Sequence, residues 1–322
     1  MLTPAGRFAP SPTGELHLGN LRTALVAWLS ARSHGRAFIV RMEDLDRVTS
    51  SAAHERDQLR ALAALGVDWD GDVIRQSERF AIYDDAIATL TTAGRTYECF
   101  CTRREIREAI SAPHSSVPDT GATGATGELV ADGAYPGTCR ELSAGQVAGL
   151  RADGRRPATR LRAGGATVAV VDELHGTVRG RVDDVVLRRN DGVPAYNLAV
   201  VVDDAAQGVA EVVRGDDLLS STPRQVLLQQ LLGLPTPTYV HVPLVLGADH
   251  VRLAKRHGAV TLGDLAALGV DAAAALALLA SSLGLAEPGD VPSARDLLAR
   301  FDVRAIPREP WVLPANLQRS VP

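Results

Sequence analysis

The chain of 322 residues contains one lysine, and because Lys and Arg together number 34, the other 33 basic side chains are arginines. That lysine, Lys255, lies in the run RLAKR at residues 252–256. A lysine ammonium is a compact point charge on a flexible stem, whereas a guanidinium is a planar fork. A position that keeps lysine among so many arginines suits contact with a phosphate whose charge changes during a reaction. Chance retention on a solvated loop is the alternative.

A second candidate is the loop at residues 9–20, which precedes an expected helix. Backbone N–H groups and the positive end of the helix dipole favour an anion at such a place. Gly19 allows a ligand to approach the backbone closely, and His17 can donate a hydrogen bond to a phosphate oxygen. His17 could instead serve only as the cap of the helix. Together with Lys255, this loop predicts a nucleotide site.

The three cysteines, Cys99, Cys101 and Cys139, fall in one stretch of the chain. Three is an odd number, and a cytoplasmic protein does not favour disulfides. Three thiolates suit a structural zinc ion, which needs a fourth ligand. On chemistry alone, His114 is a candidate for that position. Three buried cysteines without a metal are the alternative.

The elements around these residues alternate between strand and helix, which predicts an α/β fold with a doubly wound parallel sheet. Ligands of such sheets lie beyond the carboxyl ends of the strands, where residues 9–11 and Glu43 fall. The expected strands are 7–9, 37–40 and 73–74, and the expected helices are 20–33, 51–65 and 79–93.

After residue 96 the sequence pattern changes to short expected strands and a low-complexity loop at 115–133. The sheet is expected to resume later in the chain. We expect further strands at 196–202, 209–213 and 239–246, a helix from Thr222, and helices beyond Thr261. This predicts a discontinuous Rossmann-like catalytic domain at 1–96 and 190–250. An inserted, zinc-containing α+β subdomain is expected at 97–189, and a signature loop with a small helical region at 251–322.

Several motifs together resemble one family. HLGN at 17–20 and RLAKR at 252–256 resemble the two signature motifs of class I aminoacyl-tRNA synthetases. The longer segments 7–20, 41–46, 196–204 and 213–219 resemble the glutamyl branch of that family and occur in the expected order. The resemblance implies that the carboxylate of glutamate attacks the α-phosphorus of ATP, with Mg²⁺ accompanying ATP. Such a step requires positioning and charge stabilisation but no enzyme nucleophile.

The resemblance also assigns residues. ATP would be bound by His17, Gly19, Asn20 and Lys255, with His17 and Lys255 in the catalytic roles. A structural zinc would be held by Cys99, Cys101, Tyr135 and Cys139. Glutamate would be bound by Arg7, Ala9, Ser11, Glu43, Tyr196 and Arg214. A buried arginine suits the side-chain carboxylate, and Glu43 suits the ammonium. A structural ion pair is the alternative for Arg214 and Glu43.

Residues 261–322 are too few for the anticodon-binding domain of full glutamyl-tRNA synthetases, so none is expected. In this the chain resembles the glutamyl-Q tRNA(Asp) synthetases, which implies tRNA-independent activation of glutamate to glutamyl-adenylate. Transfer to the queuosine at the wobble position of tRNA(Asp) would follow. Two alternatives stay open: a minimal glutamyl-tRNA synthetase that charges a tRNA 3′ end, and an inactive RNA-binding relative.

The net charge of −4 provides no global basic field, so contact with nucleic acid must use local patches of arginine. No apolar run approaches the roughly 20 residues that span a bilayer, and the N-terminus has no basic and apolar leader. We therefore expect a cytoplasmic monomer without a membrane partner, whose substrates are L-glutamate, ATP and tRNA(Asp) that carries queuosine.

Overall fold

The computed structural model describes residues 3–111, 129–130, 134–253, 260–287 and 289–317. Lys255 and His114 lie outside these residues. The main feature is an eight-stranded sheet of order β3-β2-β1-β10-β11-β7-β8-β5. Its strands are β1 (Ala5–Phe8), β2 (Ala37–Met42), β3 (Ile74–Arg75), β5 (Leu129–Val130), β7 (Thr167–Asp172), β8 (Gly176–Arg181), β10 (Val209–Gly215) and β11 (Thr238–Val242).

Pairing within this sheet is parallel from β3 to β7, antiparallel between β7 and β8, and parallel again between β8 and β5. The mostly parallel α/β architecture predicted from the sequence is therefore present. Strands β1 and β10 are neighbours although about two hundred residues of chain separate them, with Ala5 opposite Val209 and Gly6 opposite Glu211. Their carboxyl ends consequently meet at one edge of the sheet.

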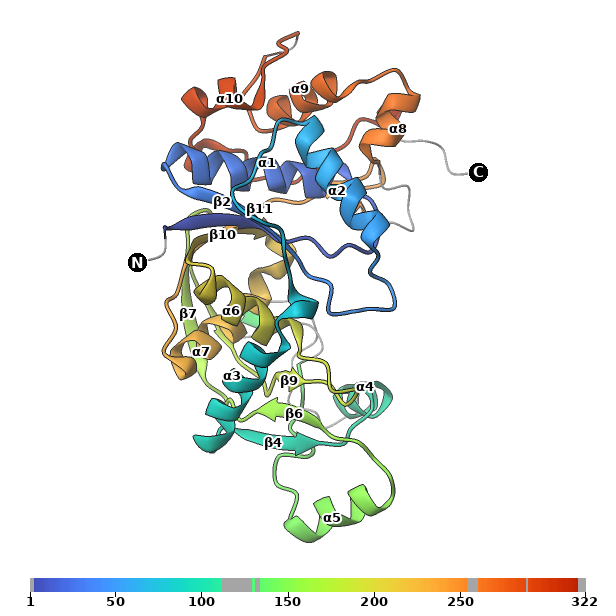
Figure 1. The fold of residues 1–322 in the computed structure, drawn as a ribbon, viewed down its shortest axis with the longest axis vertical. Helices are drawn as coiled ribbons and strands as arrows, with labels where there is room; N and C mark the ends of the chain where they lie inside the picture. Colours follow the sequence, from blue (N-terminus) through green and yellow to red (C-terminus); the bar gives the residue numbers. More distant parts are fainter. Residues whose placement is uncertain (1–2, 112–128, 131–133, 254–259, 288, 318–322) are drawn as a thin grey trace.

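Helices cover both faces of the sheet, as Figure 1 shows. One face packs against α1 (Leu18–Ser33), α2 (Ala52–Ala64), α8 (Leu262–Ala267), α9 (Ala272–Ser282) and α10 (Ala294–Leu297). The other face packs against α3 (Phe80–Thr92), α6 (Tyr196–Ala206) and α7 (Thr222–Leu232). Each face has its own hydrophobic cluster. Helix α1 lies so close to β1 that a Cβ added at Gly6 would come within 2.8 Å of the Cβ of Ala31.

The structure corrects the strand expected at 196–202, which is the first part of helix α6. Its run of Val200, Val201 and Val202 favours a strand by propensity. A short continuous apolar run cannot, however, distinguish a buried strand from a buried helix. Helix α6 is packed against α3, α7, β9 and β10, so apolar residues surround most of it. Tertiary packing has overridden the local preference.

The strand expected at 239–246 is divided. Strand β11 ends at Val242, and after Pro243 a separate strand β12 (Val245–Leu246) pairs with β13 (Trp311–Val312). Proline has no backbone N–H and so interrupts a ladder. The carbonyl of Pro243 instead accepts a hydrogen bond from Arg22 at 3.0 Å, and Arg22 also bonds to Ser282 of α9. The C-terminal helical region is thereby joined to α1.

Within the expected insertion, β4 (Thr96–Cys99), β6 (Ala158–Leu161) and β9 (Val186–Arg188) form a separate antiparallel sheet. Helices α4 (Arg103–Ser111) and α5 (Ala144–Ala152) accompany it, at the lower end of Figure 1. Strands β7 and β8, which also fall within 97–189, extend the main sheet instead. The short 3₁₀ helices are Gln76–Glu78, Asp216–Ser221, Leu298–Arg300, Val303–Ala305 and Ala315–Leu317.

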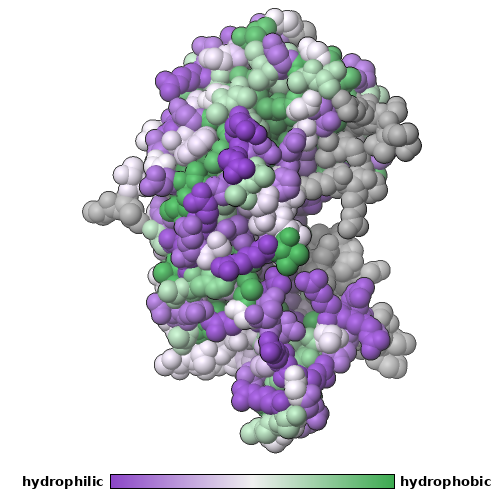
Figure 2. All heavy atoms as spheres, turned by 45° about the vertical axis from the view of Figure 1, so that its right-hand side comes forward, coloured by the Kyte–Doolittle hydropathy of each residue, from purple (hydrophilic) through white to green (hydrophobic). Residues whose placement is uncertain are grey.

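On the face that Figure 2 shows, hydrophilic residues are spread over both ends of the molecule and hydrophobic ones occur in small groups. Among the described residues, no helix has the length and apolar character that crossing a membrane would require.

Candidate functional site

A pocket of about 550 Å³ lies where β1, β2 and β10 end and α1 begins. This volume is within the range typical of small-molecule sites. The lining includes every described residue that the sequence placed on ATP or glutamate, namely Arg7, Ala9, Ser11, His17, Gly19, Asn20, Glu43, Tyr196 and Arg214. Their positions follow from the parallel pairing of β2, β1 and β10, which brings three strand ends together.

The start of α1 is fixed by a capping box. His17 is the N-cap: its Nδ1 accepts from the backbone N–H of Asn20 at 3.3 Å, and the Oδ1 of Asn20 accepts from the backbone N–H of His17 at 3.3 Å. Because Nδ1 is an acceptor, the proton of a neutral ring resides on Nε2, which is then a donor. A Cβ at Gly19 would lie 3.0 Å from the His17 ring. His17 therefore caps the helix and also lines the pocket.

The residues that flank the segment of Lys255 on either side contact the pocket or the start of α1. Leu253 lines the pocket, and Arg252, which also lines it, forms an ion pair with Asp217 at 2.6 Å. Beyond the undescribed residues, the carbonyl of Val260 accepts from the N–H of Leu18, the first residue of α1, at 2.9 Å. Lys255 itself lies outside the described residues.

Arg7 and Glu43 belong to a buried network of charges beneath the pocket. Arg41, which is fully buried, lies 2.8 Å from Asp204, 3.4 Å from Glu43 and 3.8 Å from Asp203. Arg7 lies 3.6 Å from Asp204 and donates from Nη1 to the carbonyl of Val213 at 3.1 Å. Arg7 and Glu43 are therefore fixed in place before any ligand binds.

This network affects the pKa values of Arg41 and Glu43 in different ways. Burial alone would lower the pKa of Arg41, but the three carboxylates outweigh it and leave that pKa raised. Burial also raises the pKa of Glu43, against the opposing effect of Arg41 and Arg7. A carboxylate that is costly to keep charged gains from a positive ligand group. Glu43 is consequently suited to a cationic ligand group such as an ammonium.

Arg214, near the end of β10, has hydrogen-bond partners that differ from those of Arg7 and Arg41. Its Nε donates to the Nε2 of His241 at 3.0 Å, and its Nη2 donates to the hydroxyl of Thr222 at 2.9 Å. The third nitrogen, Nη1, is buried and has no hydrogen-bond partner among the described residues. Within that same part of the chain, Glu43 forms its ion pair with Arg41 rather than with Arg214. Arg214 and Glu43 thus form no ion pair with each other, and the Nη1 of Arg214 remains for a ligand.

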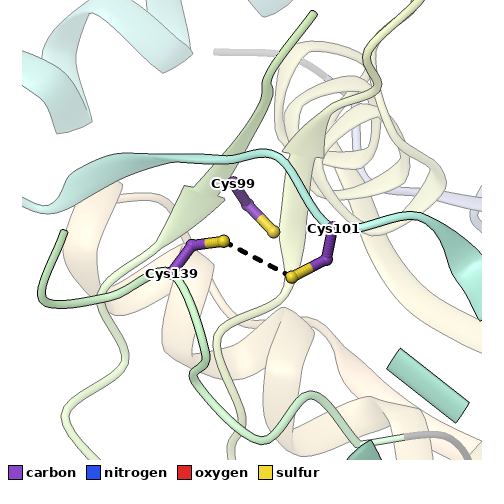
Figure 3. A group of neighbouring side chains, drawn as sticks. All are labelled: Cys99, Cys101 and Cys139. Atoms are coloured by element: carbon purple, nitrogen blue, oxygen red, sulfur yellow. Dashed lines mark hydrogen bonds between the residues drawn. The ribbon is translucent and has the colours of Figure 1, made fainter. Parts of the chain in front are cut away.

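The four residues considered for zinc also come together, although a long stretch of chain separates them. The sulfurs of Cys99, Cys101 and Cys139 all lie within 4.8 Å of one another, and all three are free thiols. Figure 3 shows the three side chains pointing toward one another. The hydroxyl of Tyr135 lies 3.3 Å from the sulfur of Cys99 and 3.6 Å from that of Cys101. Tetrahedral zinc with Zn–S bonds of about 2.3 Å spaces its sulfurs by roughly 3.8 Å. This donor set fits the metal.

The protonation of the cluster bears on that fit, because metal ligands must lose their protons. Burial raises the pKa of Cys101 to about 12 and also raises that of Tyr135. Burial opposes ionisation of Cys139 as well, but hydrogen bonds from the Phe100 backbone and the neighbouring side chains leave its pKa lowered. Arg160 lies over the ring of Tyr135, with its Cζ 3.6 Å from the ring centroid. A metal that binds here would therefore displace protons.

Sequence reasoning missed the residues that hold the pocket residues in place. These are Arg41, Asp172, Asp203, Asp204, Thr222 and His241, all of them buried. The signal for His241 was present, since it is a single histidine in the apolar strand TYVHV. Asp203 and Asp204 lie in the motif segment 196–204, but sequence reasoning assigned no role to them.

Comparison with known proteins agrees with this arrangement. Residues 5–289 match the family model described as tRNA synthetases class I (E and Q), catalytic domain. The chain is 59% identical to a glutamyl-Q tRNA(Asp) synthetase of Nocardia farcinica over 97% of this chain and 94% of that protein. It is 37% identical to a glutamate–tRNA ligase of Geobacter sulfurreducens, over 93% of this chain but 61% of the ligase.

Among solved structures, the chain is similar to a glutamate tRNA ligase from Elizabethkingia meningosepticum in complex with its amino acid. The TM-score is 0.80 and the identity 25%, over 98% of this chain and 68% of that one. The pocket, the order of the sheet and these similarities lead to one assignment. The chain belongs to the class I tRNA synthetases (E and Q) and, within them, to the family of glutamyl-Q tRNA(Asp) synthetases.

Proposed function

We propose that this protein activates L-glutamate with ATP to form glutamyl-adenylate, without needing tRNA, and then transfers glutamate to the queuosine at the wobble position of tRNA(Asp). The observation that carries the first half-reaction is the charge pattern of the pocket. Two buried guanidinium groups, Arg7 and Arg214, and one carboxylate, Glu43, whose side chain is 9% exposed, line the same cavity. This pattern complements two carboxylates and one ammonium, which are the charged groups of glutamate.

Discrimination against glutamine follows from the same groups. The side-chain carboxylate of glutamate accepts hydrogen bonds from a buried guanidinium, whereas an amide would present N–H donors to N–H donors. A site built to hydrogen-bond a particular group rejects an analogue that leaves its polar atoms unpaired. In this proposal Glu43 holds the substrate ammonium, and Ala9, Ser11 and Tyr196 complete the walls.

Activation itself requires positioning. An oxygen of the substrate α-carboxylate attacks the α-phosphorus of ATP, the bond from that phosphorus to the bridging oxygen breaks, and pyrophosphate leaves with the electron pair. The start of α1, with Gly19 and Asn20, and the Nε2–H of His17 would hold phosphate oxygens. Lys255 would neutralise the charge that builds on pyrophosphate. Mg²⁺ would enter bound to ATP.

We also propose that Cys99, Cys101, Cys139 and Tyr135 hold one structural zinc ion. The support is the 4.8 Å grouping of the sulfurs with the phenol of Tyr135 beside them. When bound, zinc would supply a cross-link between the end of β4 and the segment at 135–139. The same segment reaches the main domain, because the N–H of Tyr135 donates to Asp183, which is paired with Arg224 of α7.

The first half-reaction is tested by exchange of labelled pyrophosphate into ATP in the absence of tRNA. Glutamate should support exchange, and glutamine should not. Lys255→Ala should slow exchange far more than it weakens glutamate binding. Equal effects on the two would show that Lys255 has another role, and strict dependence on tRNA would favour a minimal glutamyl-tRNA synthetase.

The second half-reaction is tested with labelled glutamate and tRNA(Asp) that carries queuosine. Nuclease mapping should place the label in the anticodon loop, and the same tRNA without queuosine should not be labelled. Label at the 3′ end would instead indicate a glutamyl-tRNA synthetase. Absence of both exchange and transfer would indicate the inactive RNA-binding relative.

A further inference from the structure

Behind Arg214 lies a chain of buried hydrogen bonds that the proposed mechanism does not use. His241 is fully buried in β11, and its Nδ1 lies 2.7 Å from the Oδ2 of Asp172, the last residue of β7. The backbone N–H of His241 donates to the same oxygen at 3.0 Å. The other oxygen, Oδ1, accepts from the backbone N–H groups of Leu174 and His175, each at 2.9 Å.

These contacts fix both the tautomer and the charge of His241. A guanidinium has donors only, so the Nε2 of His241 must present its lone pair to the Nε–H of Arg214. The ring proton is then on Nδ1, where it is donated to Asp172. The ring is consequently neutral. In agreement, burial lowers the pKa of His241 to about 4, with Arg214 acting in the same direction and Asp172 in the opposite one.

The consequence concerns the charge of Arg214. Arg41, its counterpart on β2, has three carboxylates within 4.0 Å. Arg214 has no carboxylate within that distance in the described ranges, and its two bonded nitrogens meet a neutral imidazole and a neutral hydroxyl. Its position is therefore fixed without neutralising its charge. A carboxylate in place of the imidazole would hold the guanidinium equally well but would compete with an anionic ligand.

We propose that His241, held in one tautomer by Asp172, is a positioning residue that fixes Arg214 while leaving its charge and its Nη1 for the side-chain carboxylate of the substrate, and so contributes to selection of glutamate over glutamine. This inference rests on the proposed glutamate site. The ring of His241 is surrounded by five residues from neighbouring elements. They are Asp172 of β7, His175 of the turn after it, Arg214 of β10, Thr222 of α7 and Tyr239 of β11.

The test compares two substitutions in the full-length protein. His241→Leu keeps the volume of the side chain but removes the acceptor, whereas His241→Gln returns a carbonyl oxygen near the place of Nε2. A hydrogen bond to a charged group typically contributes enough for roughly a tenfold to hundredfold change in affinity. His241→Leu should raise the KM for glutamate by about that factor, and the glutamate-to-glutamine preference should fall with it. The KM for ATP and the kcat of exchange should change by no more than about threefold.

His241→Gln should recover most of the glutamate KM. Tyr97→Phe is the matched control, because it deletes one hydrogen bond to the fully buried Asp184 in another part of the molecule. It should lower the melting temperature without altering the KM for glutamate. If His241→Leu folds and keeps the wild-type KM, or if the Gln variant is as impaired as the Leu variant, the inference fails.

A second measurement does not depend on turnover. In ¹⁵N-histidine-labelled protein at neutral pH, His241 should show a protonated Nδ1 and an unprotonated Nε2. The opposite tautomer, or a doubly protonated ring, overturns the inference even if the enzyme is active. Failure of the wild type to exchange with glutamate would instead refute the proposed function, and the glutamate part of the inference with it.

Discussion

The pocket and the cysteine cluster differ in what completes them. In the pocket, Arg7, Glu43 and Arg214 are each held by protein partners, and one buried nitrogen of Arg214 is left for a ligand. In the cluster, three thiols and a phenol approach one another closely enough to share one ion. The first arrangement is preorganised for a ligand that comes and goes. The second is suited to an ion that stays.

The largest effect is expected from Arg214→Ala. Loss of a desolvated, ligand-binding charge typically costs enough for about a 10²- to 10³-fold fall in affinity, so kcat/KM for glutamate in pyrophosphate exchange should fall by that factor. Arg36→Ala is the matched control: it also removes an arginine, but one that lies at the amino end of β2 and is paired with the buried carboxylate of Glu211. That variant should lose stability and keep its glutamate KM. Equal losses in both variants would contradict a ligand-binding role for Arg214.

The next effect concerns the cluster. Cys139→Ser should lower zinc content from one ion per chain to nearly none and lower the melting temperature, because a structural metal contributes directly to folding. Glutamate-dependent exchange should stay within about threefold of wild type, since the pocket is assembled by other elements. Elemental analysis and calorimetry provide the measurements. A wild-type protein without zinc would remove the proposed metal site, and loss of exchange together with zinc would show that the two regions are not independent.

The pH dependence of stability sharpens the comparison further. The pKa of His241 falls from 6.5 in the unfolded chain to about 4 in the folded one. Between these two pH values the unfolded state therefore binds more protons than the folded state. The contribution of a neutral His241 to the free energy of unfolding is consequently fully present above pH 6.5 and is lost as the pH falls towards 4. It amounts to on the order of 3 kcal/mol. Urea titrations from pH 7 to 4 should show a steeper loss in wild type than in His241→Gln; parallel slopes would contradict a neutral, buried His241.

The smallest effect is expected from Tyr135→Phe. If the phenol is the fourth ligand, zinc affinity measured by competition with a chelator should fall by at least about tenfold, the factor seen when groups that merely support a ligand are lost. X-ray absorption should show three sulfurs and one lighter ligand in wild type. Unchanged affinity and spectra in the variant would assign the fourth position to another group.

Sequence patterns predicted the residues that line the pocket much better than the residues that hold them. Arg7, Glu43 and Arg214 lie in motifs whose strand ends converge, so the parallel sheet was enough to bring them together. His241 and Asp172 come from β11 and β7, and their pairing depends on sheet order that local patterns do not encode. The position of β7 beside β11 was also unexpected, because its residues fall within the predicted insertion.

Helix α6 shows the other limit of sequence reasoning. Its valine-rich run has the composition of a strand, yet its packing between helices and the sheet makes it helical. That helical geometry brings Asp203 and Asp204 to Arg41, and Asp203 also accepts hydrogen bonds from Gln76, Arg79 and Tyr83. The helix could not be inferred from local periodicity, because a short apolar run fits a buried strand equally well. The network could not be inferred either, because its partners are distant in sequence.

The neighbouring placement of β1 and β10 has a consequence for how the protein is made. Arg7 leaves the ribosome before Val213, whose carbonyl accepts its hydrogen bond, and 206 residues of chain separate the two. Contacts of such long sequence separation form slowly, and only once both segments exist. The pocket is therefore absent from the growing chain until the segment up to Leu253, which contributes to its lining, has been made. A ligand of this pocket can therefore stabilise the fold only after that segment has been made.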